Sequence, residues 1–386
     1  MSSLIMNQMN QMTKMNQMTK MNNLNNLLHY KKIFTHNRKT DKTIIFLKKP
    51  EFDIFYSCKY KYPLLVKESI TLLTGKTQAN TPLIDRRNIV DPFREDTEIP
   101  EKYRHTLNDY QEFMAIGMSM GHNAPAGQHK TNISIFGDTF LLSNITPQEM
   151  VFNSGLWVLM ENWCKHLSIN KNLYNITVFT GSIPSKQFTI YNGISMNIPH
   201  KMFKIVVLQH IKYKNTIFMD ILIGNNKPYY VNPNTQYFDF NPFLVDVKSW
   251  NWFEKFTGID IDTLLNFYNF NTREDKILPI RDVIPITISL SSSLKLLMKK
   301  SNWFGYIIYA PTITKLDSIW EECKLLETEF DNNLSFFKEY YDKVRQRLLS
   351  VELQLKNAKA VRKTQIKTRH IKQIRKRKQT RNYKYK

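Results

Sequence analysis

The chain has 386 residues, of which 42% are hydrophobic, enough apolar side chain to fill the core of one large domain, so a wholly disordered chain is excluded. The net charge of +22 favours polyanionic partners such as nucleic acid or an acidic membrane surface. Residues 1–50 carry +8 of this charge and residues 361–386 carry +12, which leaves +2 for the 310 residues between them. The basic character therefore belongs to the two ends of the chain.

The cysteines and the apolar runs narrow the class of protein further. Cys58, Cys164 and Cys323 lie far apart and form no C-x-x-C pair, so neither a disulfide framework nor a zinc cluster is predicted. An intracellular, reducing compartment is therefore favoured. No run of eighteen apolar residues occurs, and we expect no membrane partner. The acid-poor N-terminus leaves a mitochondrial presequence open, and the RKRK run at 375–378 leaves nuclear targeting open.

The first 42 residues form a low-complexity segment. Methionine recurs at every third position from Met6 to Met21, and Asn, Gln and Lys fill most of the positions between. A period of three matches neither an amphipathic helix nor a strand, so the segment is predicted to be disordered. From Thr43 the pattern changes to short apolar runs at 44–47 and 52–56, broken by prolines, which predicts strands and loops.

The middle of the chain mixes helical and strand patterns. Residues 148–167 carry apolar side chains near helical spacing and predict the first long helix. The combination with the β-rich runs that follow predicts an α+β fold. Strands are predicted at 175–180, 202–209, 217–223, 229–231 and 243–247.

The C-terminal third has a different pattern. Residues 314–357 carry apolar side chains spaced by threes and fours among many charges, which predicts an amphipathic helix or a helical pair interrupted near Asp331. From Lys356 the chain is basic without apolar periodicity. We therefore predict four segments: a disordered segment at 1–42, a globular domain at 43–264, a mainly helical extension at 265–358 and a basic, disordered tail at 359–386.

One stretch in the middle of the chain groups residues suited to phosphodiester hydrolysis. It contains His122 after a glycine, a Ser-Asn turn that ends at Asn144, and a helix with Asn153 and Glu161 two turns apart. Hydrolysis needs a base that is neutral near pH 7, and histidine, with an ordinary pKa of about 6.5, supplies one. It also needs a cation for the charge that develops on the phosphate, and Mg²⁺ keeps most of its waters, so one Asn carbonyl is a sufficient anchor.

These residues lie in blocks that resemble the DNA/RNA non-specific endonucleases, the family of endonuclease G and the sugar-nonspecific nucleases. The resemblance implies a ββα-metal (His-Me finger) active site and a mixed or antiparallel sheet. Further blocks at 93–99, 180–184, 198–207 and 243–261 are similar as well, so the resemblance covers roughly residues 56–262. Three blocks match the family in order and spacing: GHNAPAGQH (121–129), DTFLLSNITPQ (138–148) and FNSGLWVLME (152–161).

The resemblance implies a role for each matching position. His122 would be the general base that activates water, and Asn153 would be the direct ligand of Mg²⁺, with Mn²⁺ as the alternative ion. Glu161 would support the water shell of the metal, and Asn144 would help to hold the site. The structural alternatives are a helix N-cap for Asn153, a turn residue for Asn144 and a solvated helix charge for Glu161. His129 is interpreted as structural.

The chain departs from the family at two adjacent positions. Where the family has Asp-Arg before Gly-His, this sequence has Ser119-Met120, and a methionine cannot stabilise negative charge on a phosphate. Either another cation substitutes or the activity is low. Arg86, Arg87 and Arg94 lie in the segment that supplies a further substrate-facing arginine in the family. Arg87 and Arg94 are the candidates for substrate binding, with a surface role as the alternative for each.

The sequence thus predicts a metal-dependent, sequence-nonspecific endonuclease that hydrolyses DNA, RNA or both. The resemblance implies 5′-phosphate ends and, as in many family members, a homodimer. The basic segment 362–386 would hold a polyanion through sequence-independent, salt-sensitive contacts; nuclear localisation and simple solvation are the alternatives. The alternative function is a nuclease-fold protein that has lost catalysis with Ser119-Met120 and binds or packages nucleic acid.

Overall fold

The computed structural model describes residues 32–34, 43–70, 84, 92–130, 132–167, 173–245, 250–270, 276–330 and 334–382, without the side chains of residues 250, 276 and 360–382. The predicted disordered segment at 1–42, apart from 32–34, lies outside these residues, as do Arg86 and Arg87. The chain divides into two compact units: the first ends at Asn302, and the second is formed by residues 114–117 and by the chain from Trp303 onward.

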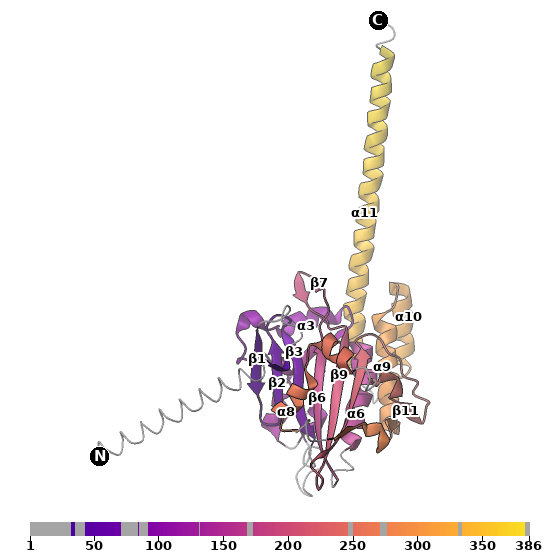
Figure 1. The fold of residues 1–386 in the computed structure, drawn as a ribbon. Helices are drawn as coiled ribbons and strands as arrows, with labels where there is room; N and C mark the ends of the chain where they lie inside the picture. Colours follow the sequence, from indigo (N-terminus) through magenta and orange to yellow (C-terminus); the bar gives the residue numbers. More distant parts are fainter. Residues whose placement is uncertain are drawn as a thin grey trace, which may run out of the picture. The chain divides into compact units, whose positions relative to one another are not determined.

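A seven-stranded sheet forms the centre of the first unit (Figure 1). Its strand order is β1-β2-β3-β6-β9-β10-β12, and each neighbouring pair is antiparallel except β10 and β12, which are parallel. The predicted α+β class with a mixed, mainly antiparallel sheet is therefore confirmed. The strands are β1 (Ile44–Lys48), β2 (Phe52–Ser57), β3 (Tyr62–Ile70), β6 (Tyr174–Ile183), β9 (Lys201–His210), β10 (Thr216–Asn225) and β12 (Lys276–Leu278).

Both faces of this sheet are buried, because alternate side chains of its long strands enter two different hydrophobic clusters. On β6, Val178 packs with Trp163 in the first cluster, whereas Phe179 packs with Leu264 in the second. Ile33 is also fully buried in the second cluster, so this residue of the predicted disordered segment is part of the core. The first cluster includes α6 (Val158–Leu167) and the start of a later helix at Leu294 and Met298, and the second includes α7 (Trp250–Thr257) and α8 (Ile261–Phe267).

A separate antiparallel pair leads directly into α6. Its strands are β4 (Met118–His122) and β5 (Ile145–Glu149), with His122 opposite Ile145 and Ser119 opposite Gln148. After β5 the chain passes through α5 (Met150–Phe152) and a π-helical turn (Asn153–Trp157) into α6. The helix predicted at 148–167 therefore begins two residues later than expected, and the order strand, strand, helix forms a ββα unit.

Two predicted strands are not strands in the structure. Residues 229–231 are extended without strand pairing, and residues 241–243 form one turn of 3-10 helix followed by a single bridge from Leu244 to Leu222. Pro228, Pro233 and Pro242 flank or interrupt these runs, and a proline has no N–H to donate to a ladder. Residues 246–247 of the second run lie outside the described residues.

Short elements complete the first unit. They fill the connections between the long strands and α6. Their bounds are α3 (Leu107–Met114), whose last residue belongs to the second unit, α4 (Ile133–Asp138), β7 (Thr189–Tyr191), β8 (Ile194–Met196), β11 (Tyr237–Asp239) and β13 (Thr287–Ser289).

The helices of the C-terminal region are α9 (Ser292–Ile308), which begins in the first unit, α10 (Ile313–Lys324) and α11 (Ser335–Asn382). The predicted helical pair is therefore present. An aromatic stack of Phe304 on Phe337, with ring centroids 4.3 Å apart, packs α9 against α11. The backbone of residues 359–382 continues α11, where the sequence predicted a disordered tail. This segment contains no Gly or Pro and is rich in Lys, Arg and Gln, which have high helix propensity.

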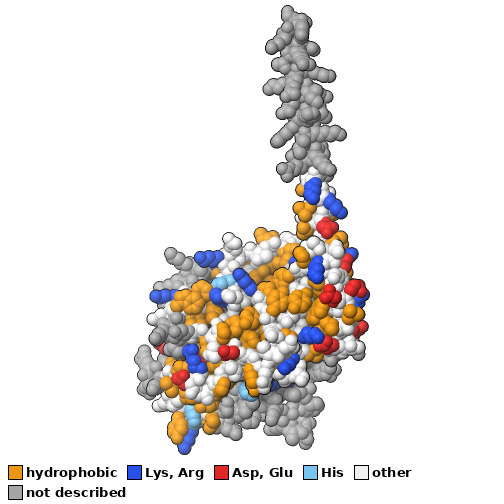
Figure 2. All heavy atoms as spheres, turned by 90° about the vertical axis from the view of Figure 1, so that its right-hand side faces the viewer, with side chains coloured by type: hydrophobic (Ala, Val, Ile, Leu, Met, Phe, Trp, Pro, Cys, Tyr) orange, Lys and Arg blue, Asp and Glu red, His pale blue; other side chains and the backbone are white. Residues whose placement is uncertain are grey.

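The charged side chains on one face of the surface can be compared with the near-neutral middle of the sequence. On the face that Figure 2 shows, apolar side chains are interspersed with side chains of both charges rather than covered by one basic surface. In the described ranges, no helix has the length and apolar character that crossing a membrane requires. The charge of the folded middle of the chain therefore gives no broad polyanion-binding face in this view.

Candidate active site

His122 ends β4, where its backbone and its ring have separate partners. The indole Nε1 of Trp157 donates a hydrogen bond to the His122 carbonyl at 3.4 Å. The imidazole packs between Phe93 and Phe140, at centroid distances of 5.5 and 5.0 Å. Gly121 lets β4 approach β5 here, because a Cβ at this position would lie 2.1 Å from Cδ of Gln148. The ββα unit thus joins the backbone of His122 to the helix that carries the predicted metal ligand, and the two phenylalanines hold its ring.

Asn153 lies on that helix and is joined to β4 through Ser119. Its amide nitrogen donates to Oγ of Ser119 at 3.0 Å, and this hydroxyl donates to the carbonyl of Gln148 at 3.0 Å. The nitrogen of the carboxamide is therefore engaged with Ser119, which fixes the orientation of the side chain. The N-cap alternative does not apply, since the carboxylate of Glu149 accepts from the backbone N–H of Phe152 as the N-cap.

Glu161 lies two turns further along the helix, with Trp157 between it and Asn153. Burial raises the pKa of Glu161 to about 7, against the opposing effect of the nearby Lys204 ammonium. Lys204 is itself almost fully buried, donates to Oγ1 of Thr180 at 2.9 Å and lies 4.5 Å from the ring centroid of Trp157. Glu161 is itself partly buried and lies near this ammonium, so it is not a fully solvated helix charge.

Asn144 holds the loop that follows His122. Its side chain is fully buried: the amide nitrogen donates to the carbonyls of Ala124 and Thr139, and the amide oxygen accepts from the N–H of Ala124. Its own carbonyl accepts two hydrogen bonds from Asn123. With the amide nitrogen and oxygen both bonded inside the loop, this residue positions the loop and has no evident direct contact to offer a substrate.

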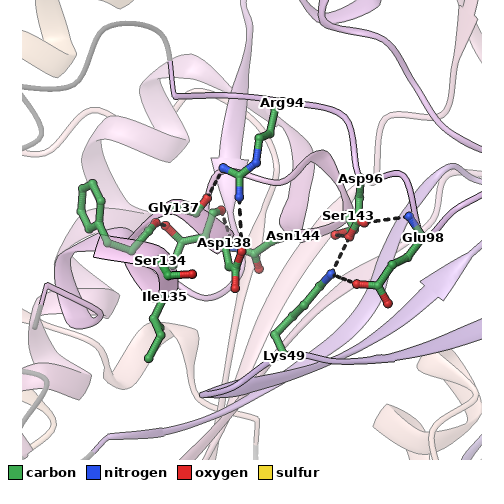
Figure 3. Close-up of polar contacts among 12 residues, drawn as sticks. Lys49, Arg94, Asp96, Glu98, Ser134, Ile135, Gly137, Asp138, Ser143 and Asn144 are labelled. Carbon is green, nitrogen blue, oxygen red and sulfur yellow. Dashed lines mark hydrogen bonds and ion pairs between the residues drawn. The ribbon is translucent and has the colours of Figure 1, made fainter. Parts of the chain in front are cut away.

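Arg94 lies on the segment beside the site, and its side chain contacts Gly137 and Asp138 (Figure 3). Its guanidinium donates to the carbonyl of Gly137 at 2.6 Å and pairs with Asp138 at 3.2 Å. Its neighbour Phe93 contacts the His122 ring instead. The Arg94 side chain is still about half exposed, so its predicted substrate-binding role stays a prediction. Arg87 lies outside the described residues.

The same segment is pinned to the Ser-Asn turn by Asp96. Ser143 donates to the Asp96 carboxylate at 2.6 Å, and the ammonium of Lys49 lies 3.0 Å from it (Figure 3). Burial alone would raise the pKa of Asp96, but these hydrogen bonds outweigh it and hold the pKa below its usual value. Asp96, one of three acids in the block at 93–99, thus fixes the turn before β5.

His129 forms a buried ionic cluster with two glutamates. Its ring nitrogens lie 2.5 Å from a carboxylate oxygen of Glu51 and 3.2 Å from one of Glu68. Burial by itself would lower the pKa of His129, but the two carboxylates outweigh it and raise the pKa to about 9. The structural interpretation of His129 agrees with this geometry. Sequence reasoning missed Glu51 and Glu68, because a charged residue in a strand pattern reads as solvated.

The donors on the helix fit a hard, hydrated cation. The carbonyl oxygen of Asn153 is a ligand type that Mg²⁺ prefers, and the carboxylate of Glu161 can accept hydrogen bonds from the waters of such an ion. Within the described ranges, no group of three or more His, Cys, Asp or Glu side chains is arranged to hold a metal, and the three cysteines are free and buried. A metal bound here would therefore have few protein ligands and several waters.

Comparisons with known proteins find relatives among nucleases. A sequence model of the DNA/RNA non-specific endonuclease family matches residues 29–267, more than half of the chain. Nuclease C1 of Cunninghamella echinulata var. echinulata is 28% identical over 229 residues, which are 57% of this chain and 85% of that protein. The mitochondrial nuclease of Saccharomyces cerevisiae is 34% identical over 138 residues, 32% of this chain and 40% of that protein.

Among solved structures, a complex of EndoG with EndoGI is similar to this chain with a TM-score of 0.49 and 20% identity. The match covers 62% of this chain and 91% of that chain. Of the curated relatives, Nuclease C1 is matched over most of its length, whereas the yeast nuclease and the human endonuclease G are matched over less than half of theirs.

Proposed function

The chain belongs to the DNA/RNA non-specific endonuclease family, and from this premise we propose that it is a metal-dependent endonuclease that hydrolyses DNA, RNA or both without sequence preference. One observation carries the proposal: two hydrogen bonds join the helix to β4, from Asn153 to Ser119 at 3.0 Å and from Trp157 to the carbonyl of His122 at 3.4 Å. They hold an imidazole and a carboxamide on one rigid unit, as a base and a metal ligand that act on one phosphate require.

Each residue then has a defined task. The neutral imidazole of His122 accepts the proton of the attacking water. Asn153 would hold Mg²⁺ through its carbonyl oxygen, and ionised Glu161 would accept hydrogen bonds from the waters of the metal. The bound cation supplies stabilisation of the charge on the phosphate and on the leaving oxygen. Asn144 keeps the loop after His122 in place.

Met120 favours a second candidate function, nucleic-acid binding without cleavage. It stands where the family has an arginine, and the guanidinium of Arg94, the described arginine of the neighbouring segment, is bonded to Gly137 and Asp138. A chain that binds the polyanion but lacks charge stabilisation at the phosphate would bind nucleic acid and cut it slowly. The two functions differ in turnover and not in affinity.

The first test is cleavage by the wild-type chain. Incubation with supercoiled plasmid and with a linear RNA in Mg²⁺ is expected to nick both, and chelation by EDTA is expected to slow cleavage by at least about 100-fold. Fragment ends are read by 5′-phosphate-dependent ligation. Re-addition of Mg²⁺ or Mn²⁺ after EDTA is the control for inactivation. Intact substrate with Mg²⁺ would contradict the enzyme and favour the binding protein.

A second prediction concerns Ser119, which we propose as a positioning residue for Asn153. Ser119→Ala removes the acceptor of the Asn153 amide, so the carboxamide loses its fixed orientation. We expect Mn²⁺ affinity to fall roughly 10-fold or more, in line with the loss of other partners that orient metal ligands. Isothermal titration with Mn²⁺ measures this without turnover. Ser119→Thr keeps the hydroxyl, which both accepts and donates, and is the matched control. Equal Mn²⁺ affinity of wild type and Ser119→Ala would exclude the role.

A further inference from the structure

A large cavity lies away from the candidate active site. Its volume is about 770 Å³, within the range of small-molecule and cofactor sites. It is formed by the turn between β2 and β3, the segment after β6 and the C-terminal part of α7. Its apolar lining includes Ile183 and Phe256, which belong to or pack against the second hydrophobic cluster. Since α6 packs in the first cluster, the central sheet separates this cavity from the ββα unit.

The charges around the cavity all have one sign. Lys59, Lys186 and Lys255 line it and are exposed, and within the described residues the lining contains no Asp or Glu. The ammonium of Lys59 donates to the hydroxyl of Tyr60 at 3.2 Å and lies 4.8 Å from the centroid of the same ring, and this partner carries no opposite charge. A cavity with three ammonium groups and no carboxylate favours an anionic occupant.

Aromatic rings stand beside these lysines. Tyr60 stacks on Phe188, with centroids 6.3 Å apart and planes at 23°, and the Phe188 side chain is 42% exposed. On the other side, Phe256 stacks on the half-exposed Trp252, with centroids 4.8 Å apart. Exposed aromatic faces next to cations are the combination with which proteins bind single strands: the rings stack on bases and the cations contact phosphates.

We propose that this cavity binds a segment of single-stranded nucleic acid, with phosphates on Lys186 and Lys255 and a base stacked on Phe188. The inference rests on the proposed function and deepens it, because the cavity would hold a substrate strand at a second point on the molecule. The aromatic faces distinguish this occupant from an acidic peptide, which needs the positive charge but no stacking surface. Neither contact involves the bases' hydrogen-bonding edges, so binding is expected to be independent of sequence.

Binding is measured by fluorescence anisotropy of a labelled oligo-dT of ten nucleotides. The full chain carries His122→Ala and the buffer contains EDTA, so that the oligonucleotide is not cleaved. The double variant Lys186→Glu/Lys255→Glu is expected to bind at least about 10-fold more weakly, with a salt slope smaller by roughly 1.4, since each phosphate contact on a single strand contributes about 0.7. The matched control is Lys212→Glu/Lys214→Glu, which makes the same charge change on exposed lysines of the turn between β9 and β10. Equal affinity of the two double variants would overturn the proposal.

Two further readouts separate the cavity from binding by the basic segment at 362–386. A 5-iodouracil oligonucleotide is expected to crosslink to the peptide that contains Phe188, and crosslinks found only on other peptides would overturn the proposal. Polyglutamate is expected to compete much less well than unlabelled oligo-dT, and equal competition would overturn the assignment to nucleic acid. Hydrolysis of the small substrate bis(4-nitrophenyl) phosphate is measured with His122 restored. The Lys186→Glu/Lys255→Glu chain is expected to hydrolyse it as fast as wild type. Absence of any hydrolysis by wild type would count against the proposed function alone.

Discussion

Replacing His122 by alanine is expected to slow plasmid cleavage in Mg²⁺ by about 10²–10⁴-fold, the usual contribution of a positioned general base. The variant should fold, because the Trp157 indole bonds to the His122 backbone carbonyl and not to the ring. The truncation removes the ring contacts with Phe93 and Phe140. Initial rates of conversion of supercoiled to nicked plasmid measure the effect, with thermal unfolding of both proteins to verify the fold.

The matched control is His166→Ala, which removes an exposed imidazole from the last turn of α6. It is expected to cleave like wild type, since the side chain lies on the solvent-facing part of the helix. Mn²⁺ affinity should be close to wild type in both variants, because His122 is proposed as the base and not as a metal ligand. Equal cleavage rates in wild type and His122→Ala would exclude His122 as the base and leave the family fold without its proposed chemistry.

The largest expected effect on stability is at His129. His129→Ala removes the partner of two carboxylates, of which Glu68 is 1% exposed, and leaves an uncompensated buried charge. Breaking a buried ionic cluster in this way costs about 3–5 kcal/mol of the free energy of unfolding. Urea denaturation followed by tryptophan fluorescence measures it. His166→Ala again serves as the control, with an expected change within about 0.5 kcal/mol. A His129→Ala chain as stable as that control would contradict the ionic role.

The same cluster predicts a pH dependence. His129 has a pKa of about 9 in the folded chain, above the ordinary value of 6.5, so folding favours its protonated form. The resulting stabilisation is complete below pH 6.5 and is lost as the pH rises towards 9. At 1.36 kcal/mol per pH unit it is worth about 3 kcal/mol. The difference in unfolding free energy between wild type and His129→Ala should therefore shrink from pH 6.5 to pH 9, and a constant difference would place the titration elsewhere.

Several features of this protein follow from the sequence alone. Runs of β-branched and aromatic residues predicted the long strands, and threes-and-fours spacing predicted the helices, because both patterns are local and reflect which side chains one element buries. The motif blocks around His122 and Asn153 identified the family, since they preserve both residue type and spacing, and the match over residues 29–267 confirms it. At 229–231 the local pattern was misleading: prolines flank this apolar run, and no strand forms there.

Tertiary structure decided the partners of these residues. In the sequence, Ser119 only marks the position where the family has an aspartate. In the folded chain its hydroxyl accepts a hydrogen bond from the amide of Asn153, 34 residues away. The carboxylates on His129 come from 78 and 61 residues away, on and beside neighbouring strands. The sequence pattern allowed Glu161 to be a solvated helix charge, whereas in the folded chain burial raises its pKa to about 7. A local pattern records which face of an element is apolar, whereas ion pairs, hydrogen bonds and desolvation depend on which elements meet, and only the folded chain determines that.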